Sequence, residues 1–127
     1  GELLNYALKM NCQNILFGVG GSATSDGGLG ALQALGLTFS GIPIPAKGKD
    51  MIDIAEINDY RPHWLENINF QIACDVNNPF TGMHGSAKTY GPQKCSSTID
   101  SKVIINQLEK SMLHLKKLIL NKPLMVK

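Results

Sequence analysis

Residues 14–36, NILFGVGGSATSDGGLGALQALG, place an apolar run, a glycine-rich run and a second apolar run in succession. The first run is short and continuous and is bounded by turn residues, which predicts a buried strand over residues 14–19. The second run, Leu29 to Leu35, predicts a helix that Gly36 can close from the position after its C-cap. The glycine loop, which we define as residues 18–28, therefore lies where a strand gives way to a helix and where backbone amides are free to bind a ligand.

The rest of the chain also alternates between helical and strand patterns, without an internal repeat. Strands are expected at residues 37–39 and 68–74, whereas residues 51–57 fit either a short strand or a helical turn. Helices are expected at residues 2–10 and 86–90, and a long third one is expected to start after an N-cap at Thr98, with Asp100 in its first turn. One face of that helix carries Ile104, Leu108, Met112, Leu115 and Ile119. This order predicts an α/β fold class, with helices packed on a sheet.

Composition favours a single globular domain or domain fragment over residues 1–127. Of the 127 residues, 43% are hydrophobic and 17% are charged, which is typical of a soluble protein with a core. There is no apolar run of about 18 residues and no signal-peptide pattern, so we expect no membrane partner and a cytoplasmic location. The three cysteines form no zinc-binding pattern and are expected to be reduced thiols.

The formal charge of +2 is close to balance, although lysines gather in the last quarter of the chain. No aromatic residues interleave with them to stack on bases, so we interpret them as a solvated helix face and expect no nucleic-acid partner. These lysines are Lys102, Lys110, Lys116, Lys117, Lys122 and Lys127.

The glycine loop has the groups needed to hold a phosphate or a carboxylate. Backbone amides of Gly20, Gly21 and Ser22 and the hydroxyls of Ser22, Thr24 and Ser25 are candidates for this near a helix start. A dinucleotide fingerprint matches only at Gly18, Gly20 and Ala23, and no acidic residue follows about 20 positions later to bind the ribose. A P-loop is excluded because no Gly-Lys-Ser/Thr closes the run.

Asp26 in the same loop has two interpretations, which the sequence leaves open. Aspartate is a preferred N-cap, so Asp26 can cap the helix that begins near Leu29. Alternatively, its carboxylate can hold Mg²⁺ or accept a proton from a substrate hydroxyl.

A second polar loop, residues 74–94, follows the strand at residues 68–74. Asp75, Asn77 and Asn78 cluster at the carboxyl end of that strand, where open α/β sheets place their ligands, although Asn-Asn-Pro is also ordinary turn chemistry. Lys94 is either a point charge for a phosphate or a surface lysine. His84 is either a base or merely exposed.

Both loops resemble the glycerate kinases of the bacterial type I family. The matching stretches are GELLNYAL (1–8), NILFGVGGSATSDGGLGALQALG (14–36), ACDVNNPFTG (73–82) and GSAKTYGPQK (85–94). The resemblance implies transfer of the ATP γ-phosphoryl group to D-glycerate with Mg²⁺, giving phosphoglycerate, generally 2-phosphoglycerate. It also implies a two-domain kinase with the active site in the cleft, of which this chain is a central fragment from the inserted mixed α/β domain.

The resemblance indicates which residues face the cleft, whereas their roles follow from residue chemistry. Asp26 and Asp75 are the catalytic candidates, and one of the two is the expected Mg²⁺ ligand. The expected substrate- or phosphate-binding residues are Gly20, Gly21, Ser22, Thr24, Asn77, Asn78, Gln93 and Lys94. We expect the fragment alone to be inactive.

Two alternatives belong to other classes of protein. One is a non-catalytic remnant that binds an anion or associates with itself, which favours a homodimer because removal of a neighbouring domain exposes apolar surface. The other is a nicotinamide-dependent oxidoreductase, which rests only on the glycine spacing.

Overall fold

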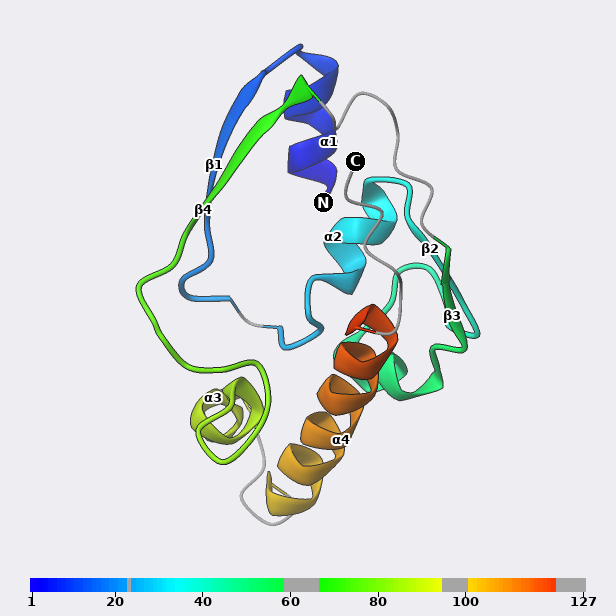
Figure 1. The fold of residues 1–127 in the computed structure, drawn as a ribbon, viewed down its shortest axis with the longest axis vertical. Helices are drawn as coiled ribbons and strands as arrows, with labels where there is room; N and C mark the ends of the chain where they lie inside the picture. Colours follow the sequence, from blue (N-terminus) through cyan, green and yellow to red (C-terminus); the bar gives the residue numbers. More distant parts are fainter. Residues whose placement is uncertain (23, 59–66, 95–100, 121–127) are drawn as a thin grey trace.

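The chain forms a mixed α/β fold with one parallel and one antiparallel strand pair (Figure 1). The computed structural model describes residues 1–22, 24–58, 67–94 and 101–120. The helices are α1 (Glu2–Lys9), α2 (Leu29–Ala34), α3 (Ser86–Lys94), α4 (Ser101–Leu120) and the 3₁₀ helix η1 (Gly48–Asp53). The strands are β1 (Asn14–Gly18), β2 (Thr38–Ser40), β3 (Glu56–Asn58) and β4 (Asn69–Ala73). The predicted α/β class is confirmed, whereas Thr98 and Asp100 lie outside the described residues.

The segment from β1 to α2 has the predicted strand, loop and helix. Helix α2 ends as expected, with Gly36 in the left-handed region at φ 98°. The Gly36 amide donates to the Gln33 carbonyl and the Leu37 amide to the Leu32 carbonyl, which is the Schellman pattern of helix closure. Residues 51–57, which the sequence left undecided, contain the end of η1, a short extended linker and the start of β3.

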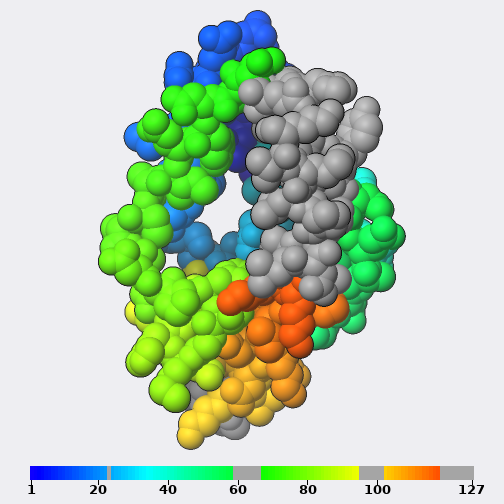
Figure 2. Space-filling model, in the orientation of Figure 1, coloured from blue at the N-terminus to red at the C-terminus, as the bar shows by residue number. Residues whose placement is uncertain are grey.

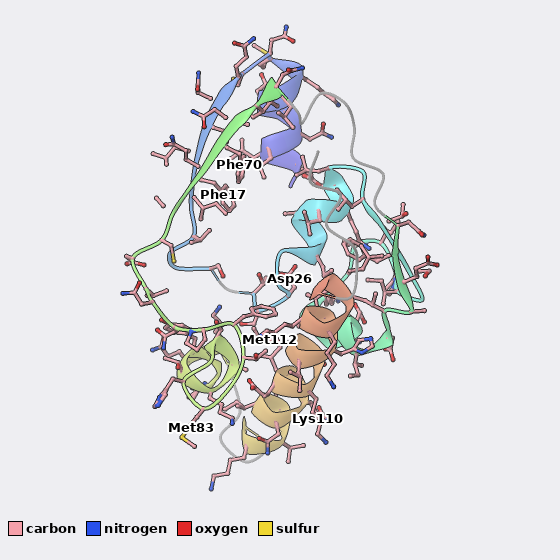
Figure 3. The ribbon with its side chains drawn as sticks, viewed as in Figure 1. Phe17, Asp26, Phe70, Met83, Lys110 and Met112 are labelled. Atoms are coloured by element: carbon pink, nitrogen blue, oxygen red, sulfur yellow. The ribbon has the colours of Figure 1, made fainter. Side chains whose placement is uncertain are left out.

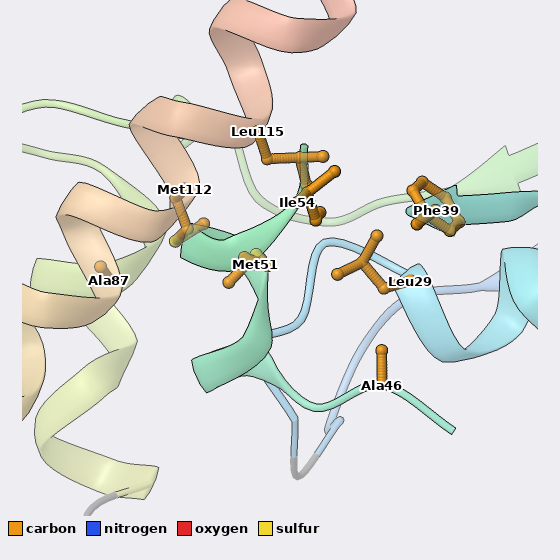
Figure 4. Close-up of a cluster of buried hydrophobic side chains, with 8 residues drawn as sticks. All are labelled: Leu29, Phe39, Ala46, Met51, Ile54, Ala87, Met112 and Leu115. Atoms are coloured by element: carbon orange, nitrogen blue, oxygen red, sulfur yellow. The ribbon is translucent and has the colours of Figure 1, made fainter. Parts of the chain in front are cut away.

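The core lies between α2, η1, α4 and the antiparallel β2–β3 pair, as Figure 4 shows. Leu29, Met51 and Ile54 are fully buried, and each contributes about 2 kcal/mol by leaving water. Met112 and Leu115 of α4 are also buried, as the spacing of apolar residues along this helix predicts. The core thus fixes α4 against the elements that follow the glycine loop.

Strands β1 and β4 pair in parallel, with Asn14 opposite Asn69 and Gly18 opposite Ala73. The prediction that residues 14–19 form a buried strand was wrong about burial, because only Ile15 is half-buried. No third strand joins this pair among the described residues, so both of its outer edges are unpaired, and most of the side chains on its two faces are exposed. An opening is visible beside β4 in the space-filling view (Figure 2).

Apolar side chains occupy both faces of the β1–β4 pair. Phe17 and Phe70 stack with ring centroids 6.0 Å apart, and they lie side by side in Figure 3. Ile72 shares their face and is 61% exposed, whereas Leu16 lies on the opposite face and is 72% exposed. Parallel sheets are usually covered on both faces, so this pair has the composition of a sheet interior without its covering layers.

Candidate functional site

Both polar loops begin at the same end of the β1–β4 pair, where the two strands finish. The sequence predicts that each loop follows a strand, and the parallel pairing of the two strands places the starts of the glycine loop and of residues 74–94 at neighbouring carboxyl ends. The Val19 amide donates to the Ala73 carbonyl at 3.1 Å, so the two chains still run side by side where the loops start. The carboxyl ends of β1 and β4 therefore bring together polar residues that are far apart in the sequence.

Lys94 is the last residue of α3, which extends four residues beyond the helix expected at residues 86–90, and its side chain joins this helix to the glycine loop. Its Nζ atom donates to the Thr24 carbonyl at 2.7 Å, to Ser25 Oγ at 3.2 Å and to Ser22 Oγ at 3.5 Å. All three partners are neutral oxygens, so the ammonium charge is not cancelled by them. Lys94 is exposed, as a surface lysine is, and its charge also lies on the loop proposed to bind an anion, so both interpretations of it stay open.

The glycine loop itself remains open to solvent. Gly20, Gly21, Ser22 and Thr24 are exposed, and Gly21 adopts a positive φ of 67°, which suits glycine. A Cβ atom added at Gly20 or Gly21 would meet no heavy atom within 4 Å. The backbone of these residues is therefore accessible to a small molecule.

Asp26 stabilises the start of α2, where Figure 3 shows it. Its Oδ1 accepts from the Gly28 amide at 3.0 Å and its Oδ2 from the Gly30 amide at 3.2 Å. Gly28 is the N-cap residue, so Asp26 caps the helix from two positions further back. Of the two interpretations, the structure supports capping directly, because both carboxylate oxygens accept hydrogen bonds from the helix start.

The candidates of the second loop divide into two groups. Asn78 is engaged within the loop, because its amide donates to the His84 carbonyl and Thr89 Oγ1 and its Oδ1 accepts from the Tyr90 hydroxyl at 2.7 Å. Asn78 therefore holds the loop in shape. Asp75, Asn77 and Gln93 are exposed, and the structure gives their side chains no hydrogen bond to another described residue.

Sequence reasoning missed Glu109, which anchors the second loop. Its Oε1 accepts from the Gly82 amide at 2.6 Å, which ties the loop to α4. Its Oε2 is buried and has no partner in the part of the chain that the structure describes.

A cavity of about 590 Å³ adjoins Lys94, and it lies between the glycine loop, η1, α3 and α4. Ser25 and Lys94 line it together with two further lysines, Lys49 and Lys110. Figure 3 labels Lys110 on α4, where the sequence predicted only a solvated face. Ile104, Gln107 and Ser111 also line the cavity from α4. Their spacing of three and four residues places them on one side of the helix, and this spacing is the pattern from which the sequence could have predicted a shared surface.

The fold and the site together define an α/β protein in which backbone amides, hydroxyls and a lysine lie exposed close to the ends of two parallel strands. The glycerate kinase family model matches residues 1–125, and the chain belongs to that family. The nicotinamide interpretation is left without support, and Ala23 lies outside the described residues. No helix in the described ranges is long and apolar enough to cross a bilayer.

Individual relatives agree with the family match. A "Glycerate kinase" of Bacillus subtilis (strain 168) is 40% identical over 114 residues, which cover 84% of this chain and 29% of the relative. A "Glycerate 2-kinase" of Escherichia coli (strain K12) is 36% identical over 119 residues, covering 90% of this chain and 30% of the relative.

The solved structure of a putative glycerate kinase 2 from Salmonella typhimurium LT2 is similar to this chain, with a TM-score of 0.80 and 32% identity. The similarity covers 93% of this chain and 32% of that one. The chain thus spans about a third of the length of the relatives that it matches.

Proposed function

We propose that this chain contributes the glycine loop and the Lys94 side of the active site of an ATP-dependent D-glycerate kinase. The observation that supports this most directly is the position of the Lys94 ammonium on the glycine loop, within a chain of the glycerate kinase family. Phosphoryl transfer depends mainly on positioning and on charge stabilisation, and an ammonium beside free amides supplies both for a phosphate or carboxylate.

In this proposal the loops bind the anionic groups of the substrates. Amides of Gly20 and Gly21 and the hydroxyls of Ser22 and Thr24 orient the carboxylate of D-glycerate or the transferred phosphate, while Lys94 offsets its charge. Asn77, after β4, and Gln93, in α3, are exposed and supply amide donors. A hydroxyl oxygen of D-glycerate attacks the γ-phosphorus, its proton passes to a carboxylate, and ADP leaves. The name of the Escherichia coli relative favours 2-phosphoglycerate as the product.

Asp75 is the better candidate for that carboxylate than Asp26. Its side chain has no hydrogen bond to a described residue, whereas both oxygens of Asp26 are occupied at the start of α2. Mg²⁺ needs only one or two protein carboxylates, because phosphate oxygens and waters complete its octahedral shell. The described residues contain no group of three metal-ligating side chains, and a single carboxylate such as Asp75 fits a Mg²⁺ ion carried by ATP. When bound there, Mg²⁺ would neutralise charge on the phosphates.

Exchange of each aspartate for asparagine, at the aligned position of a complete relative, tests this assignment. Asp75→Asn is expected to lower turnover at least about a hundredfold, because the proton acceptor is lost. Asp26→Asn is expected to cost less than about tenfold, because asparagine is also a good helix cap. Steady-state kinetics would measure both, and the melting temperature would report lost capping. A hundredfold loss for Asp26→Asn with near-normal activity of Asp75→Asn would reverse the two roles.

Two further proposals concern the domain to which the chain belongs and the compartment in which the protein works. Residues 1–127 belong to the inserted domain of the kinase, which is consistent with the uncovered faces of β1 and β4. The protein works in the cytoplasm, where the exposed and unpaired thiols of Cys12 and Cys74 would stay reduced.

The exposed apolar side chains of β1 and β4 favour self-association of the isolated chain, as in a homodimer. We expect sedimentation to show a concentration-dependent shift to dimers or larger species, because exposed apolar patches favour association. The double variant Leu16→Lys and Ile72→Lys is expected to shift the equilibrium toward monomer. Leu3→Lys on α1 is a matched control, since Leu3 is 80% exposed but lies outside the pair. A sharp monomer peak for the unmodified chain at all concentrations would contradict the expectation.

A further inference from the structure

The cavity beside Lys94 has an unusual distribution of charge. Lys49 of η1, Lys94 of α3 and Lys110 of α4 all line it, and no aspartate or glutamate is among the described residues of its wall. Three different elements thus each bring one positive charge to a single hollow. Such a site favours a ligand with several negative charges.

The wall of the cavity also carries apolar side chains. Ile52, Ile104 and Leu108 line the cavity, and Ile104 is 42% exposed. Apolar walls with a few placed polar groups are typical of pockets for organic molecules rather than for inorganic ions alone. The ligand should therefore combine an apolar or aromatic body with a multiply charged end.

Size argues against D-glycerate as the occupant. The volume of about 590 Å³ lies within the range of sites for drug-sized ligands, about 300–1,000 Å³, and a three-carbon acid would leave most of it empty. Lys94 marks the end of the cavity nearest the glycine loop, because its Nζ atom lies 3.2 Å from Ser25 Oγ. A long ligand in the cavity can therefore present its charged end to that loop.

We propose that this cavity is the binding site of the nucleoside triphosphate donor. The base and ribose pack against Ile52, Ile104 and Leu108, and Lys49 and Lys110 bind phosphate oxygens along with Lys94. The terminal phosphate then lies at the Lys94 end, next to the loop that holds the acceptor. The assignment rests on the proposed kinase function and adds two binding residues to it.

Calorimetric titration of the 127-residue chain with ATP, and separately with inorganic tripolyphosphate, tests the assignment. Lys49→Ala and Lys110→Ala are each expected to weaken ATP binding about tenfold, because each removes a charged hydrogen-bond donor. Lys88→Ala on α3 and Lys102→Ala on α4 change the charge equally but lie outside the cavity wall, and they should change the affinity less than about twofold. Ile104→Thr keeps the branch at Cβ but shortens the side chain and makes it polar, and it should weaken ATP several-fold but not tripolyphosphate.

The contrary results are equally specific. Equal affinities for ATP and tripolyphosphate, with no effect of Ile104→Thr, would show a phosphate site without nucleoside contacts and overturn the assignment. Equal losses in the cavity and control lysines, or no ATP binding by a chain that still melts cooperatively, would also overturn it.

Titration with D-glycerate, followed by NMR at the Gly20 to Asp26 amides, separates this failure from that of the proposed function. Glycerate shifts without ATP binding would remove only the nucleotide assignment. Loss of both responses would count against the nucleotide assignment and against binding by this side of the proposed active site.

Discussion

The 127-residue chain, supplied with ATP, Mg²⁺ and D-glycerate, is expected to form no phosphoglycerate above the rate without protein. In the proposed function the chain supplies one side of the active site, and Gly20, Gly21, Ser22, Thr24 and Asp75 are all open to solvent. Transfer requires both substrates to be held in line and their charges to be stabilised, and enzymes do this in closed, water-excluding sites. Water would compete for the open amides and weaken each charge interaction.

A coupled assay for ADP together with chromatography of phosphoglycerate would measure this activity. The complete Bacillus subtilis relative, at the same concentration, is the positive control. The chain must also show a cooperative melting transition, so that inactivity is not due to unfolding. Turnover by the folded chain within about a hundredfold of the complete relative would contradict the expectation and would mean that these loops alone suffice.

Replacement of Lys94 by methionine, at the aligned position of a complete relative, is expected to lower turnover by about a hundred- to a thousandfold. Methionine keeps an unbranched apolar stem but removes the ammonium that lies 2.7 Å from the Thr24 carbonyl and 3.2 Å from Ser25 Oγ. Removal of a single donor that stabilises charge in a transition state typically has an effect of this size. The loss should fall mainly on kcat, because the charge on the transferred group is greatest in the transition state.

Lys88→Met is the matched control, because Lys88 is an exposed lysine on the same helix and does not contact the glycine loop. Its turnover should stay within about twofold of the unmodified enzyme. If Lys94→Met lowered the melting temperature but left kcat within about tenfold, the lysine would serve only to hold the two loops together.

Local elements of the fold could be predicted from the sequence because their signals are local. The apolar run before the glycine loop predicts β1, and Gly36 predicts the end of α2, since both depend on neighbouring residues alone. The position of both polar loops at strand ends was predicted for the same reason. Their meeting at one edge follows from the parallel pairing of β1 with β4, which no local pattern specifies.

Burial and side-chain partners could not be predicted in this way. The apolar residues of β1 have the pattern of a covered strand, and sequence alone does not show whether covering layers are present. Asp26 has the residue type of both a cap and a base, and the sequence does not show that its carboxylate accepts hydrogen bonds from the amides of Gly28 and Gly30. The sequence around Lys110 predicts a lysine on a solvated helix face. Lys110 lines the cavity because α4 packs against η1.

The hydrogen bond from Lys94 to the Thr24 carbonyl joins residues 70 positions apart. During synthesis, the glycine loop therefore leaves the ribosome well before its lysine partner has been made. Closure of so long a loop is slow compared with the formation of a helix such as α2. The contact between Lys94 and the glycine loop is thus made late in folding, after the residues of β1, the glycine loop and α2 have all left the ribosome.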